Sequence, residues 1–259
     1  MENEPTDHTL LKLTGLTLGF TSLILACRWL VSLVASTATA LLGSEIIAVV
    51  VLVLCNRYWW HIRLSYRPVA VQKMWHVGWI GWLIVIVFGG QAIGEMVINP
   101  DWPAAFAATL MVFLTAFYEE TLFRGIILNT LLRKLTGSRK FISAALLSSA
   151  LFGLAHAIHF FDNVNQNSVY TWLQIGYAVC LGVYFCAVAT RSGSLVWSII
   201  FHACFDYPAM VIAFSHTSTA AMSLTGGGTI SWLASDVFLF LPIMLVGLWL
   251  LRPAKRQVK

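Results

Sequence analysis

Charged residues are scarce in this sequence, making up 10% of its 259 positions, whereas 59% of the residues are hydrophobic. Soluble domains carry roughly 25% charged residues, so the scarcity excludes water as the main solvent of the folded chain. The net charge of +5 comes from short basic clusters between apolar runs, not from one basic face. We therefore expect no nucleic-acid partner, and we expect transmembrane helices instead.

Two further patterns are missing. The first eight residues contain no Lys or Arg, whereas a secretory signal peptide starts with a basic segment, so we expect the first apolar run to remain as a helix. The cysteines lie inside apolar runs without C-x-x-C spacing, which favours reduced packing residues over a metal site. These cysteines are Cys27, Cys55, Cys180, Cys186 and Cys204.

Apolar runs recur along the whole chain, and each is about long enough to cross a ~30 Å hydrocarbon core. We predict eight transmembrane helices, centred on residues 12–34, 40–56, 76–98, 104–130, 141–160, 170–190, 194–215 and 231–251. No soluble domain, long linker or internal repeat interrupts them. The sequence therefore predicts an all-α fold, a polytopic helical bundle that forms a single transmembrane domain over residues 1–259.

Lys and Arg occur in every second connection between these runs. Basic connections lie at 57–73, 133–140, 191 and 252–259, whereas those at 99–103, 161–168 and 215–231 contain neither residue. The positive-inside rule then places both termini and the basic loops in the cytoplasm. We expect a multi-pass integral membrane protein, of the bacterial inner membrane or, in a eukaryote, of the endoplasmic reticulum.

Ionisable residues inside the runs are functional candidates, because a charge at a helix centre costs about 2.5–3.5 kcal/mol on insertion. The run 104–130 contains Glu119, Glu120 and Arg124. Adjacent residues point about 100° apart, so the two carboxylates have different environments. Glu120 and Arg124 are four residues apart and are predicted to form an ion pair. This pairing leaves Glu119 free to react.

Two histidines add to this set. His156 follows small residues, including Gly153, that allow close helix approach. His202 and Asp206 share one helical face, and a carboxylate beside an imidazole fixes its tautomer. At 1.5 Å per residue, Glu119, His156 and His202 lie about 20, 22 and 12 Å from the cytoplasmic ends. We expect these three to line one polar cavity that is open to the cytoplasm.

The remaining ionisable residues have structural explanations. Most lie near run ends, where a short displacement of the side chain reaches the headgroups, and a lone deeper cation can pair with a carboxylate of another helix. We expect structural roles for Arg28, Glu45, Glu95, His159 and Asp236.

The three motifs resemble those of the CPBP family, membrane proteins that include CAAX prenyl endopeptidases and bacterial proteins grouped with bacteriocin self-immunity. The family motifs are Glu-Glu-x-x-x-Arg, Phe-x-x-x-His and His-x-x-x-Asn. This chain has them, in that order, at Glu119 to Arg124, at Phe152 to His156, and at His202 to Asp206. The resemblance covers roughly residues 110–210, and it indicates a motif-bearing catalytic core at about 104–215.

The resemblance implies a glutamate-dependent intramembrane endopeptidase. Glu119 would be the general base, His156 would help to hold the attacking water, and His202 would donate to the developing oxyanion. Glu120 and Arg124 would support the site. The substrate would be a membrane-anchored protein or peptide, cleaved near its C-terminus if it is CAAX-like.

Asp206 departs from the family motif, which has Asn at this position. An Asn side chain donates hydrogen bonds, but an ionised Asp only accepts them and would repel an oxyanion. We therefore expect Asp206 to accept from His202 and to orient its ring.

Two alternatives remain open. Zinc could be bound by Glu119, His156 and His202, although the usual His-Glu-x-x-His motif is absent and the preferred mechanism requires no cofactor. The same buried charges could also mark a proton-coupled transporter or a noncatalytic immunity or chaperone-like membrane protein. An inverted-repeat transporter should show matched halves, whereas the polar motifs here are confined to residues 119–206.

Overall fold

The computed structural model describes residues 7–67, 69, 71–98, 100–161, 168–215 and 226–252. Within these ranges the chain is helical and contains no strand. The α-helices are α1 (Asp7–Ser32), α2 (Thr37–Cys55), α3 (Val71–Val77), α4 (Trp79–Ile98), α5 (Trp102–Glu120), α6 (Leu128–Lys134), α7 (Lys140–Ala155), α8 (Ser168–Ser192), α9 (Val196–Phe214) and α10 (Gly226–Leu250). Short π-helices, η1 (Asn56–Trp60) and η2 (Thr121–Ile127), and a 3₁₀-helix, η3 (His156–Phe160), continue three of them.

Seven helical stretches of the described residues are long and apolar enough to cross a membrane. They are His8–Ser32, Ala38–Trp60, Trp79–Ile98, Trp102–Lys134, Lys140–Phe160, Ser168–Ser192 and Val196–Phe214. The helix α10 occupies the last predicted run and contributes a shorter apolar helix, Val237–Leu250. The prediction of a polytopic helical bundle is therefore confirmed, and each predicted run contains a helix.

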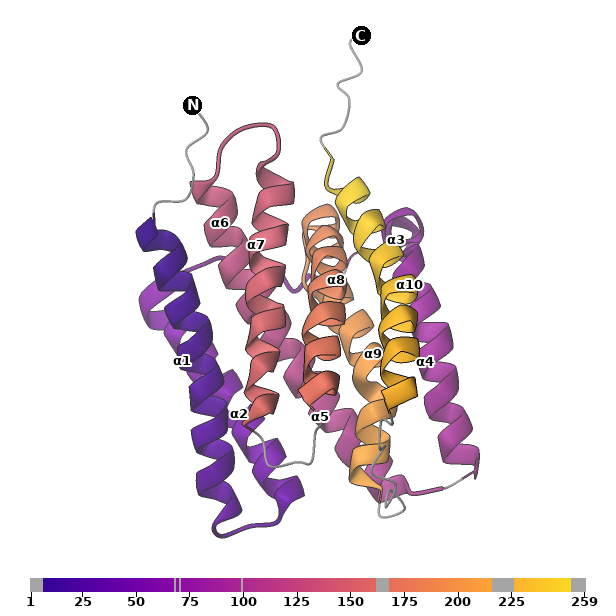
Figure 1. Ribbon diagram of the computed structural model, residues 1–259. Coiled ribbons are helices and arrows are strands. Elements are labelled where there is room, and N and C mark those ends of the chain that lie inside the picture. The colour runs from indigo at the N-terminus through magenta and orange to yellow at the C-terminus, as the bar shows by residue number, and fades with distance from the viewer. Residues whose placement is uncertain are drawn as a thin grey trace.

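The helices form one bundle and alternate in direction (Figure 1). The start of α1, the α6–α7 connection and the end of α10 lie at one end of the bundle, which we call the basic end because its connections carry the Lys and Arg clusters. The α1–α2 and α4–α5 connections lie at the opposite end, which we call the far end. The most buried helix is α8, which packs against both α7 and α10.

Local sequence explains where two of these helices begin. The Ser36 side chain accepts a hydrogen bond from the Thr39 N–H and caps α2, and Asp101 caps α5 through the Ala104 N–H at 3.0 Å. Such caps satisfy N–H groups that lack a helical partner. At Gly153, an added Cβ would lie 2.9 Å from the Ile175 carbonyl oxygen. The predicted close helix approach at Gly153 is therefore confirmed.

A non-helical segment, described at residues 61–67 and 69, follows η1 and is bonded to other parts of the bundle. Its backbone is bonded to other elements: Ser65 accepts from the Leu195 N–H at 2.9 Å, and Val69 accepts from the Trp197 indole at 3.0 Å. The Tyr66 hydroxyl bonds the Thr121 hydroxyl at 2.8 Å, and burial raises the pKa of Tyr66. Buried backbone groups outside regular helices require such partners.

Candidate active site

The two glutamates end α5, and the π-helix η2 follows directly. π-helical segments within α-helices are frequently found at functional sites. Arg124 lies within η2, and its Nη1 is 2.9 Å from Glu120 Oε1. Both side chains are fully buried, with 0% exposure. The predicted Glu120–Arg124 ion pair is therefore present.

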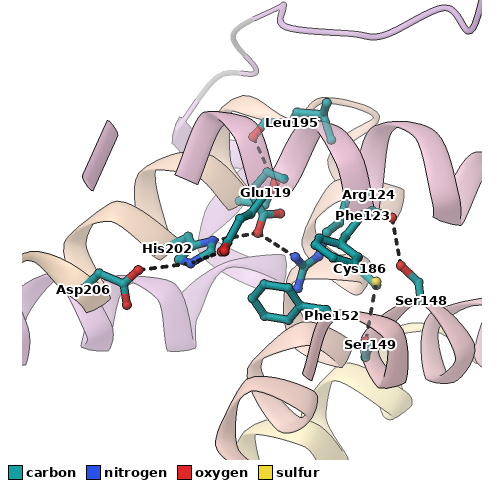
Figure 2. Close-up of polar contacts among 12 residues, drawn as sticks. Glu119, Phe123, Arg124, Ser148, Ser149, Phe152, Cys186, Leu195, His202 and Asp206 are labelled. Carbon is teal, nitrogen blue, oxygen red and sulfur yellow. Dashed lines mark hydrogen bonds and ion pairs between the residues drawn. The ribbon is translucent and has the colours of Figure 1, made fainter. Parts of the chain in front are cut away.

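His202, on α9, lies among three carboxylates (Figure 2). Its Nδ1 is 2.9 Å from Glu120 Oε1, and its Nε2 is 3.2 Å from Asp206 Oδ2 and 3.4 Å from Glu119 Oε2. A neutral imidazole donates from one nitrogen only, whereas an imidazolium donates from both. A protonated His202 can therefore donate to carboxylate oxygens from both of its ring nitrogens. The predicted Asp206–His202 contact is present, but the contact with Glu120 was not foreseen.

The three carboxylates around His202 differ in solvent exposure. The Glu119 side chain is 18% exposed and that of Asp206 is 29% exposed, whereas Glu120 is sealed in the bundle. Glu119 is therefore the member of the adjacent pair that reaches open space. Acidic side chains outnumber basic ones in this cluster: three carboxylic acids surround the two basic groups of Arg124 and His202.

His156 stands where α7 ends and η3 begins. Its Nδ1 lies 2.9 Å from the Phe152 carbonyl oxygen, which can only accept, so Nδ1 carries the proton. In the neutral ring the other nitrogen, Nε2, is then an acceptor. His156 can therefore accept a hydrogen bond from a water or a substrate group.

Two phenylalanines enclose the buried charges. The Arg124 guanidinium lies 4.2 Å from the Phe152 ring centroid and 5.5 Å from that of Phe185, within the range of cation–π attraction. Phe185 also stacks on His202, with ring centroids 5.4 Å apart. Phe152 belongs to a recognised motif, but Phe185 was missed. No sequence signal distinguishes Phe185, since it is one apolar residue within the apolar helix α8.

A cavity of about 330 Å³ connects the predicted residues. Its lining includes all four of the predicted catalytic residues, Glu119, His156, His202 and Asp206. It also includes three residues for which a structural role was expected, namely Arg28, Glu45 and His159. Glu95 is not part of this lining, and the side chain of Asp236 lies outside the described residues.

The cavity does not open as expected. Its lining on α9 runs from His202 to Ala213, next to the last residue of the helix, and its lining on α8 runs from Phe185 back to Tyr170, near the first. Those helix ends lie at the far end of the bundle (Figure 1). The prediction of a cavity open at the end that carries the basic loops is therefore wrong. The mismatch in predicted depth arose because α9 begins inside the bundle, at a turn bonded to Ser65.

The zinc alternative does not fit this arrangement. Among the described residues, no group of three His, Cys, Asp or Glu side chains is placed to hold a metal ion. Both ring nitrogens of His202 face carboxylate oxygens, so neither presents a lone pair to a metal. A site built from Glu119, His156 and His202 would require the His202 ring to leave its partners.

Residues 100–208 match the family model described as type II CAAX prenyl endopeptidase, Rce1-like. The matched stretch contains all the motif residues discussed above, from Glu119 to Asp206. Comparisons with curated proteins and with solved structures gave no significant match.

Proposed function

We propose that the chain, whose residues 100–208 match the Rce1-like CAAX endopeptidase family model, is an intramembrane endopeptidase that hydrolyses a peptide bond of a membrane-anchored protein or peptide. If the substrate is CAAX-like, the bond lies near its C-terminus. The observation that carries the proposal is the asymmetry of the glutamate pair. Glu119 reaches the cavity and contacts His202, whereas Glu120 is sealed against Arg124.

Glu119 is the general base in this mechanism. It takes a proton from a water in the cavity, and the water oxygen bonds to the scissile carbonyl carbon while the carbonyl electron pair moves onto oxygen. His156 accepts a hydrogen bond through Nε2 and orients this water. Positioned proton transfer of this kind contributes typically 10²–10⁴-fold to rate.

His202 stabilises the tetrahedral intermediate by donating from Nε2 to the oxyanion. A preorganised donor in a water-poor site is worth about 3–4 kcal/mol to the transition state. Glu119 then returns its proton to the leaving nitrogen as the C–N bond breaks, which releases a carboxylate and an amine. Glu120 and Arg124 act as positioning residues, because Glu120 holds the opposite ring nitrogen of His202.

The test is Glu119→Gln, which keeps the shape of the side chain and removes its basicity. Membranes of cells expressing the wild type or the variant are compared by mass spectrometry of protein C-termini. We expect cleaved termini to disappear in Glu119→Gln, while uncleaved substrates copurify with the folded variant. Glu95→Gln on α4, away from the cavity, is the matched control and should leave cleavage unchanged.

Unchanged cleavage in a folded Glu119→Gln protein would overturn the proposal. If no chain-dependent cleavage occurs at all and the Glu119→Gln variant keeps the cellular phenotype of the wild type, the protein acts by binding, as a noncatalytic immunity or chaperone-like protein would.

A further inference from the structure

The cavity is closed toward the basic end and exposed toward the far end. On α9, the lining residues His202, Asp206, Ala209 and Ala213 form one stripe with helical spacing. His202 is buried at the top of this stripe, whereas Ala209 and Ala213 are exposed. The open part of the cavity therefore lies beside the last two turns of α9.

Buried side chains form the opposite wall. The lining residues closest to the basic end, Phe123, Leu181 and Phe185, are each at most 3% exposed. In the connection at the basic end, Ser65 accepts a hydrogen bond from the Leu195 N–H and Val69 accepts one from the Trp197 indole of α9. A second cavity of about 280 Å³ lies there, near Arg63 and Leu195, but none of the four predicted catalytic residues lines it.

Charge indicates which side of the membrane each end faces. Connections at the basic end contain the Lys and Arg clusters, and those at the far end contain neither residue. Cytoplasmic loops are the ones enriched in Lys and Arg. The basic end is thus the cytoplasmic one, and the cavity opens in the half of the membrane that lies across from the cytoplasm.

From these observations we infer that the site receives its substrate from the translocated side of the membrane. The substrate is then an exported, membrane-anchored protein whose scissile segment lies at or just inside the outer boundary of the bilayer. This inference rests on the proposed protease function. On this inference the chain does not trim the cytoplasmic C-termini of lipid-modified proteins. Such a terminus would approach from the basic end, where the residues that line the cavity are buried.

The test is cysteine labelling in intact cells, in a variant whose five native cysteines are replaced by Ala. Ala213→Cys places a thiol at the cavity mouth, and Ser138→Cys places one in the α6–α7 connection as the matched control. The probe is a sulfonated maleimide that does not cross membranes. We expect at least tenfold more labelling of Ala213→Cys than of Ser138→Cys, and equal labelling once the cells are permeabilised.

The reverse pattern, with Ser138→Cys labelled from outside, would overturn the inference. Labelling does not require turnover, so adding Glu119→Gln must leave it unchanged, and failure of the protease proposal can be told from failure of this one. If the cysteine-free chain does not fold, the wild-type chain is fused at its C-terminus to green fluorescent protein or to alkaline phosphatase. Fluorescence without phosphatase activity supports the inference, and phosphatase activity without fluorescence overturns it.

Discussion

Glu120→Gln should destabilise the folded protein far more than the neighbouring Glu119→Gln. The Glu120 carboxylate is fully buried, and its Oε1 lies 2.9 Å both from Arg124 Nη1 and from His202 Nδ1. Gln is almost isosteric but carries no charge, so the substitution leaves the Arg124 guanidinium buried without its counter-ion. Removing one partner of a buried ion pair costs about 3–5 kcal/mol.

The measurement is thermal unfolding of both purified variants in the same detergent, followed by tryptophan fluorescence. For a chain of this size, about 2–4 °C of midpoint shift accompanies each kcal/mol, so Glu120→Gln should unfold roughly 6–20 °C below the wild type. Glu119→Gln should stay within about 3 °C, because its side chain is partly exposed and its contact with His202 is 3.4 Å long. Equal midpoints for the two variants would refute the assignment of Glu120 as the structural carboxylate.

Two further predictions concern the chemistry of His202. Asp206→Asn should keep at least about a third of the wild-type kcat, because its amide oxygen still accepts from Nε2, while Asp206→Ala should lose about tenfold or more; complete loss in a folded Asn variant would contradict the orienting role of Asp206. Exhaustive treatment with chelators should leave turnover unchanged, because carboxylates already occupy both ring nitrogens. Inactivation that added zinc reverses, with one zinc per chain by metal analysis, would contradict this prediction.

The fold could be predicted from the sequence because hydropathy alone requires it. Runs of about 20 apolar residues have few stable conformations in lipid other than the helix. The depth of α9 was not predictable in this way. Its start is set by a turn at Gly193, with a φ of 68°, and by the Leu195 bond to Ser65. These partners are far apart in sequence, so hydropathy places the helix end only approximately.

Pairs within one helix were predicted and pairs between helices were not. Spacing of four residues identified Glu120–Arg124 and His202–Asp206, and both are present. The Glu120–His202 contact joins residues 82 positions apart, and no periodicity connects α5 with α9. The direction of the cavity was missed for a related reason, because it depends on how helices far apart in the sequence, among them α5, α8 and α9, pack against one another.

The position of His202 between the carboxylates suits the proposed chemistry in one further respect. When Glu119 takes a proton from water and the oxyanion forms, one negative charge disappears from Glu119 and one appears on the substrate oxygen. Both positions face the same ring nitrogen, Nε2 of His202, whose other nitrogen stays fixed by Glu120. The donor therefore changes acceptors without a change in the net charge of the site. Because reorganising charge in a low-dielectric site is expensive, this short transfer favours Glu119 over any more distant base.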